Sequence, residues 1–199
     1  MRKSLLLLLA LASTYSAVAR GALAYDEAVS VDLSGDGFAP TAFALHPGIN
    51  TLKGRTGGGD LDYAALTVPT GYRLDALFVR SGTSAAGSGS FIGVQAGTQV
   101  TVPSSPADAT GLLGWYLYSA ANIGANILPM MGVPKQNSTG FTPPLAEGSY
   151  AFWIQELGAQ SPYNFEFQVA AVPEPASMVL LLAGLGVLAA AVRRRGARA

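Results

Sequence analysis

Carboxylate side chains are the groups in this sequence whose spacing best suits chemistry, and they gather in two short stretches. Asp32 and Asp36 stand in the run Asp-Leu-Ser-Gly-Asp-Gly, which opens like a calcium-binding loop. An EF-hand is excluded, because its twelfth position is a bidentate Glu and Phe43 stands there. Asp60 and Asp62 follow three glycines that let backbone carbonyls come close. The four carboxylates predict a calcium site built from hard oxygen ligands; the alternative is that Asp and Gly form Asx-turns at strand ends.

Groups for other kinds of catalysis are scarce. His46 is the only histidine and lies in an evident turn before Pro47 and Gly48. The chain has no cysteine, which excludes thiol catalysis and disulfide bonds and leaves zinc without thiolate ligands. Neither a Gly-x-Ser-x-Gly nucleophile motif nor a Gly-Lys phosphate loop occurs. We therefore expect a protein that is not an enzyme.

A secreted carbohydrate-active enzyme is the alternative, because glycoside hydrolysis needs only a pair of carboxyl groups. Nothing in the spacing of the acidic residues selects such a pair. The candidates for it are Asp60, Asp62, Asp75, Glu147 and Glu156.

Aromatic side chains offer a second kind of surface chemistry. Trp115, Tyr116 and Tyr118 lie in the run 113–118, where one alternating set of a strand faces inward and the other outward. Exposed rings beside acidic side chains suit stacking on a polysaccharide, so these residues are candidate carbohydrate contacts. The alternative is that they pack in the core and at its edge.

The charge of the chain is divided unevenly. Its net charge is zero, with 12 basic and 12 acidic residues, but most basic residues lie at the two ends. Residues 25–171 hold 5 basic and 11 acidic side chains, a net charge of −6. Such a surface repels phosphate, so nucleic acid is excluded as a partner.

The elements that must position these side chains are β-strands. Short alternating or aromatic-rich runs are separated by Gly, Pro and Asp turns, which is typical of an all-β, single β-sandwich domain over residues 25–171. From 119 to 142 the alternation stops, and we expect a loop or short helix within 120–131. The expected strands are 28–33, 42–45, 49–52, 63–68, 72–79, 91–94, 98–102, 112–118, 150–155 and 163–169.

The first residues have the pattern of a secretory signal peptide. Arg2 and Lys3 precede the apolar run 5–12, and residues 22–24 (Ala-Leu-Ala) suit signal peptidase. We predict a signal peptide over 1–24 with cleavage before Tyr25. Residues 17–19 (Ala-Val-Ala) are a second possible site.

The last residues predict a short membrane span. The uncharged run 176–192 gives a helix of about 25 Å, against a hydrocarbon core of about 30 Å. Arg193, Arg194 and Arg195 follow it, begin the basic tail 193–199 and hold that end on the cytoplasmic side. Before it, Val172-Pro173-Glu174-Pro175 is kept extended by its prolines, so a protease reaches it.

Residues 172–195 resemble the PEP-CTERM sorting signal of Gram-negative bacterial exported proteins, which joins a Val-Pro-Glu-Pro motif, a Leu/Ala/Gly helix and a terminal Arg cluster. The resemblance implies recognition by a membrane exosortase and cleavage near Pro173 to Pro175. Release or transfer to the cell surface would follow, often alongside exopolysaccharide production and biofilm. The alternative is a plain membrane anchor, which has no need of Pro-Glu-Pro.

The body also resembles the bacterial pre-peptidase C-terminal domain, through residues 59–63, 68–74, 144–150 and 163–167 in family order. The chain departs from that family in the long segment 82–142. The resemblance implies a jelly-roll-like β-sandwich that binds or solubilises and performs no reaction.

We therefore predict an exported, surface-sorted structural or binding component of the extracellular matrix. It has a signal peptide (1–24), a β-sandwich (25–171) and a sorting signal (172–199). Signal peptidase and an exosortase are its processing enzymes, and polysaccharide is the candidate partner. It crosses the inner membrane, is held there transiently by the C-terminal helix, and reaches the cell surface or matrix. No cofactor is expected apart from calcium, and a calcium-stabilised adhesive module is a further alternative.

Overall fold

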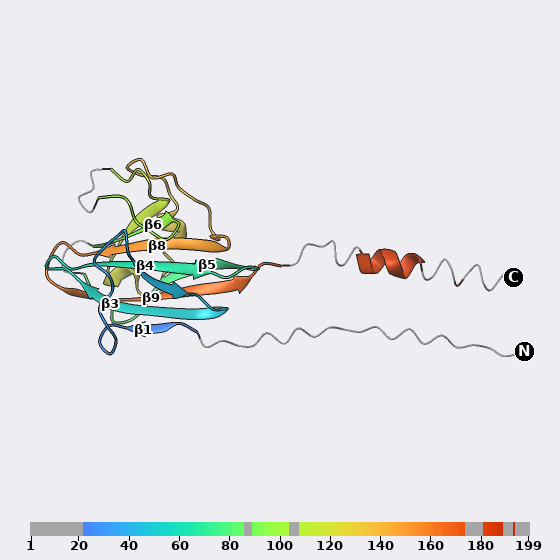
Figure 1. Ribbon diagram of the computed structural model, residues 1–199, viewed down its shortest axis with the longest axis horizontal. Helices are drawn as coiled ribbons and strands as arrows, with labels where there is room; N and C mark the ends of the chain where they lie inside the picture. Colours follow the sequence, from blue (N-terminus) through green and yellow to red (C-terminus); the bar gives the residue numbers. More distant parts are fainter. Residues whose placement is uncertain (1–21, 86–88, 104–107, 174–180, 189–192, 194–199) are drawn as a thin grey trace, which may run out of the picture.

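The computed structural model describes residues 22–85, 89–103, 108–173, 181–188 and 193. This part of the chain forms two β-sheets packed face to face (Figure 1). The prediction of an all-β protein with two packed sheets is therefore confirmed.

The first sheet has four strands in the order β1-β3-β9-β5. Strand β1 (Ala24–Asp26) runs parallel to β3 (Gly48–Thr56). Strand β9 (Ser161–Ala171) is antiparallel to both β3 and β5 (Tyr72–Val79). The end of β9 and the start of β1 therefore lie on the same side of the sandwich (Figure 1).

The second sheet has five strands in the order β2-β4-β8-β6-β7. Strand β2 (Thr41–Ala44) is parallel to β4 (Leu61–Val68), which pairs with β8 (Gly148–Gln155). Strands β6 (Ser90–Ala96) and β7 (Gly114–Tyr118) complete the sheet. Between β7 and β8 the chain forms the 3₁₀-helix η1 (Ala120–Asn122) and the short helix α1 (Leu128–Met131), as the loss of alternation after residue 118 predicted.

The core between the sheets follows from the period of two in a strand. In β9 alternate residues face inward, and Tyr163, Phe165 and Phe167 are buried. Phe167 meets Phe152 of the other sheet edge to face, with ring centroids 5.2 Å apart. Each such ring stabilises the fold by about 2–3 kcal/mol through removal of apolar surface from water.

The outer face of the second sheet carries a smaller apolar cluster of its own. Trp153 of β8 is fully buried there. Its ring stacks on Tyr63 with centroids 6.1 Å apart and packs at a tilt against Phe91 with centroids 4.6 Å apart. The segment after β6 covers these rings with Val100 and Val102. Strands β4 and β8 are consequently buried on both faces over much of their length.

Two expected strands are wrong. Residues 28–33 form an irregular loop in which Val29 and Val31 are 87% and 82% exposed, so their alternation marks no buried face. Residues 98–102 also form no strand. There Val100 donates its amide hydrogen to Gly37 O, and the segment lies over the sheet face as a cover instead of extending an edge. The other expected strands are confirmed within a few residues at their ends.

Strand β1 was not expected, because its first residue fell inside the predicted signal peptide. Ala24 pairs with Thr51, and Leu23 bonds in both directions: its amide donates to Asn50 Oδ1 and its carbonyl accepts from Thr51 N at 2.8 Å. Cleavage before Tyr25 would remove these contacts, whereas cleavage after residue 19 would keep them. Both sites remain predictions, and residues 1–21 lie outside the described part.

The predicted membrane span lies only partly within the described residues. Residues 181–188 are helical, while 176–180 and 189–192 lie outside the description, as do Glu174, Pro175, Arg194 and Arg195. Within the residues that are described, no helix has the length and apolar character needed to cross a bilayer. The transmembrane helix over 176–192 stays a prediction.

Candidate functional site

Three carboxylates from separate parts of the chain converge at one end of the sandwich. Glu27, Asp32 and Asp62 each contribute an oxygen, and these atoms all lie within 4.8 Å of one another. We call these three residues the acidic cluster. Glu27 directly follows β1, Asp32 lies in the loop after it, and Asp62 is the second residue of β4. Asp62 is fully buried, Glu27 is half-buried and Asp32 is exposed.

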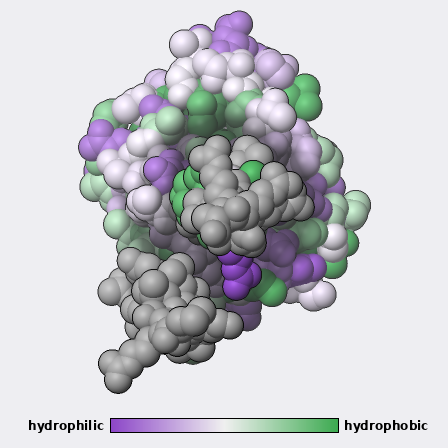
Figure 2. Space-filling view, turned by 90° about the vertical axis from the view of Figure 1, so that its right-hand side faces the viewer, coloured by the Kyte–Doolittle hydropathy of each residue, from purple (hydrophilic) through white to green (hydrophobic). Residues whose placement is uncertain are grey.

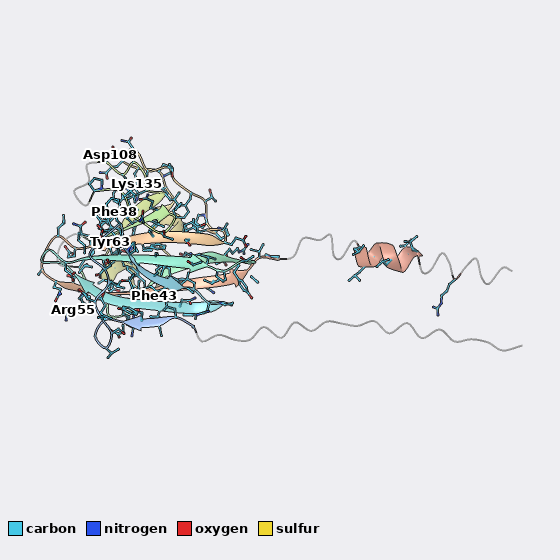
Figure 3. All side chains as sticks on the ribbon, viewed as in Figure 1. Phe38, Phe43, Arg55, Tyr63, Asp108 and Lys135 are labelled. Carbon is cyan, nitrogen blue, oxygen red and sulfur yellow. The ribbon has the colours of Figure 1, made fainter. Side chains whose placement is uncertain are left out.

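Glu27 is held in place by backbone amides. Its Oε1 accepts from Leu33 N at 3.2 Å and its Oε2 from Arg55 N at 2.8 Å, so both ends of the carboxylate are fixed. The Tyr25 hydroxyl donates to Val31 O and closes the loop that carries Asp32. Figure 3 shows Arg55 at the end of the sandwich away from the C-terminal helix, which places the acidic cluster at that end.

Gly54 makes room for this arrangement. A Cβ atom on Gly54 would collide with Glu27 Oε2 and with the Tyr163 hydroxyl. The absence of a side chain in the middle of β3 is therefore what lets Glu27 and Tyr163 reach the same place.

Asp62 is the most unusual member of the acidic cluster. Its Oδ2 accepts from the Tyr163 hydroxyl at 2.7 Å, but its Oδ1 has no hydrogen-bond partner although the residue is fully buried. The pKa of Asp62 is raised to about 8, chiefly by burial and also by the charges of Glu27, Asp60 and Asp32, while the Tyr163 hydrogen bond opposes the rise. Protonation of Asp62, or a bound cation, would remove the cost of burying its negative charge beside other carboxylates.

The neighbouring carboxyl groups are perturbed in the same direction. Burial raises the pKa of Glu27, and the amide hydrogen bonds from Arg55 and Leu33 oppose that rise. Burial and the charge of Asp32 raise the pKa of Asp60. Among the described residues the ion pairs are Lys53–Asp26, Arg73–Asp75 and Arg80–Glu166, so no member of the acidic cluster has a basic partner there.

Part of this site was predictable from the sequence. The structure brings Asp32 and Asp62 together and puts Asp60 nearby, where the charge of Asp32 raises the pKa of Asp60 and the charge of Asp60 raises that of Asp62. It does not bring Asp36, whose Oδ1 instead accepts from Phe38 N at 2.9 Å in an Asx-turn. Glu27 was not predicted, because no ligand-like run surrounds it in the sequence and only the fold places it beside Asp32 and Asp62.

The three aromatic residues predicted to contact carbohydrate have different surroundings in the structure. Tyr118 is 1% exposed and packs edge to face on Phe165, so it lies where no polysaccharide reaches it. Lys135 Nζ sits 4.6 Å from the centroid of the Trp115 ring and 5.2 Å from that of Tyr116. Phe91 stacks on Trp115 at 5.8 Å. Carbohydrate contact by Trp115 and Tyr116, which are both half-buried, stays a prediction.

The C-terminal segment leaves directly from the last strand. Strand β9 ends at Ala171, and Val172 N donates to Gly71 O at 2.9 Å. A family model described as the PEP-CTERM protein-sorting motif matches residues 171–195. The chain carries a PEP-CTERM sorting motif. The motif supports an exosortase-processed, surface-sorted protein that is exported and held transiently at the membrane before processing.

The other two comparisons with known proteins add little about the body of the chain. The search of curated proteins found no match. The crystal structure of Aeromonas hydrophila PliG, a periplasmic lysozyme inhibitor of g-type lysozyme, is similar over 65% of this chain and 96% of its own. Their sequence identity is 14% and the TM-score is 0.35, too low for an argument about fold or function. The resemblance of the body to the pre-peptidase C-terminal domain stays a prediction.

The residue at which the PEP-CTERM motif begins, Ala171, and the acidic cluster lie at opposite ends of the sandwich. Strand β9 runs from Ser161, beside Thr56, to its final residues beside Gly48, and the motif continues from there. Figure 2 looks onto this exit end, where hydrophilic and hydrophobic residues are interspersed in the part that is in view.

Proposed function

We propose that this PEP-CTERM protein is an exported, non-enzymatic structural or binding component of the extracellular polysaccharide matrix of a Gram-negative bacterium. The observation that carries the proposal is the sorting motif at residues 171–195, which follows a completed β-sandwich. Sorting delivers the folded body to the surface, and the body then supplies an acidic interaction module.

The position of the Pro-Glu-Pro motif just after the last strand supports cleavage that leaves the sandwich intact. Ala171 is the last residue of β9, and the Pro-Glu-Pro motif begins at Pro173. Cleavage within residues 173–175 therefore removes no residue that pairs in either sheet. The released body therefore keeps both sheets and the core between them.

The roles of the acidic residues support a protein without catalytic activity. Glu147 Oε2 accepts from Gly71 N at 2.7 Å, and Asp75 pairs with Arg73 at 3.0 Å. Glu156 is buried and accepts from Ser90 Oγ and from Gly158 N. Asp62 is fully buried, so a polymer chain cannot contact it. Each of these carboxylates is hydrogen-bonded, ion-paired or buried within the fold, whereas a glycosidase needs two carboxyl groups that face one sugar.

The test is to recover the protein from the surface of the producing cells and assay it on extracellular polymer. We expect the protein to sediment with the polymer and to hydrolyse none of a polysaccharide panel. A control with the Pro-Glu-Pro residues replaced by Ala should stay with the membrane fraction. Turnover of any polysaccharide that is abolished by an acid-to-amide substitution would instead support the carbohydrate-active enzyme.

A further inference from the structure

The acidic cluster raises an electrostatic problem that the fold alone leaves unsolved. Three carboxylate oxygens lie within 4.8 Å of one another, and among the described residues no basic side chain pairs with them. One of the three, Asp62, is fully buried with Oδ1 unpartnered. Burying an unpaired carboxylate is costly, so such a group is found with a hydrogen-bond partner, a shared proton or a metal ion.

We propose that the acidic cluster binds a calcium ion, with Glu27, Asp32 and Asp62 as its carboxylate ligands. Asp60 adds negative charge beside the site without being one of the converging ligands. This inference concerns the sandwich itself and does not rest on the proposed function.

The ligand chemistry selects calcium. All three side chains offer hard carboxylate oxygens and none offers nitrogen or sulfur, which disfavours zinc and copper. The ligands come from two parts of the chain and form an irregular set, which calcium accepts with six to eight oxygens, some from water. Magnesium demands near-octahedral geometry and gives up its water reluctantly.

The surroundings of the ligands are built to orient them. The Tyr163 hydroxyl donates to Asp62 Oδ2, which leaves Oδ1 for the ion. The backbone amides that hold Glu27 use one acceptor position on each oxygen, while a carboxylate has about four. Supporting hydrogen bonds of this kind fix ligands in metal sites generally.

The ion would fasten the N-terminal segment to the sandwich. Glu27 and Asp32 flank a loop whose Val29 and Val31 are exposed, so apolar burial contributes little to holding it. Asp62 belongs to β4 of the other sheet. Calcium bound between them links the loop and β1 to the second sheet, and its removal frees residues 28–32, up to the buried Leu33.

The test titrates calcium chloride into the chelator-treated full chain in detergent, by calorimetry and by thermal unfolding. We expect one site with an affinity on the order of 0.1–1 mM, the range of extracellular calcium modules. Calcium should also raise the Tm and slow proteolysis within 28–32. Asp32→Asn, an exposed substitution, should weaken binding at least tenfold. Asp36→Asn, the same change four residues away, should leave binding unchanged, because Asp36 lies outside the cluster.

Two results would overturn the proposal. One is the absence of both binding heat and a Tm shift at about 10 mM calcium, well above that affinity range, which would mean that the carboxylates share protons instead. The other is equal weakening by Asp32→Asn and Asp36→Asn, which would mean that calcium binds loosely to the acidic surface. Asp62→Asn serves as a second variant: it keeps an oxygen acceptor for Tyr163, and we expect it to weaken binding as Asp32→Asn does.

Discussion

Replacing Asp62 with Asn should change how the stability of the calcium-free protein depends on pH. The pKa of Asp62 is raised from 3.8 to about 8 in the folded chain, chiefly by burial. Between pH 4 and pH 8 the unfolded chain has released this proton while the folded chain keeps it. Raising the pH through this window therefore favours unfolding, and the loss is complete above pH 8.

The magnitude follows from the size of the shift. One pKa unit corresponds to about 1.4 kcal/mol, so the full shift would cost about 5–6 kcal/mol above pH 8. Entry of water and movement of the loop carrying Asp32 reduce that cost, and we expect a loss of about 3 kcal/mol between pH 5 and pH 8. This is a substantial part of the 5–15 kcal/mol that typically stabilises a domain.

The assay is urea unfolding in chelator, followed by the fluorescence of the buried Trp153 at several pH values. Wild type should lose stability from pH 5 to pH 8, Asp62→Asn should lose most of that dependence, and the exposed control Asp36→Asn should keep it. A wild-type stability that is flat or rises over this range would refute the reasoning, as would an Asp62→Asn variant with the wild-type slope.

Two further predictions concern the N-terminal half of the structure. Gly54→Ala should destabilise the protein by about 1–3 kcal/mol in thermal unfolding, because the added methyl group collides with Glu27 and Tyr163. Gly35→Ala is the control, since its methyl group meets only an ordinary contact of 3.6 Å with Leu61 O. Equal losses of stability in the two variants would contradict the packing around Gly54. N-terminal sequencing of the exported protein should find a start upstream of Tyr25, because the first contacts of β1 precede that residue. A start at Tyr25, in a protein as stable as one that keeps Leu23 and Ala24, would show that these contacts are dispensable.

The sequence predicted much of the fold because the core strands alternate or are rich in aromatic residues. In β9 the buried Tyr163, Phe165 and Phe167 are spaced by two, and β5 and β8 were equally recognisable. The same rule failed for residues 28–33, since Val29 and Val31 alternate without a sheet to face. It failed for 98–102 because the segment packs against a sheet face that single-sequence periodicity cannot reveal.

The candidate site was predictable only in part, for a reason of topology. Asp60 and Asp62 were found through the glycines before them and Asp32 through its loop-like run. The sequence cannot say that the chain after β1 folds back over Gly54, which brings in Glu27 and leaves Asp36 outside. Nor does it reveal that Asp62 points inward, because β4 is buried on both faces and its alternation is lost.

The central claim is that the folded sandwich is cargo and that the segment after β9 is a removable sorting handle. The most direct measurement is the intact mass of the protein recovered from the cell surface. We predict a C-terminus within or just before Pro173 to Pro175, with Ala171 retained at the end of β9. Surface protein whose mass includes Arg193 and the residues around it would contradict the account.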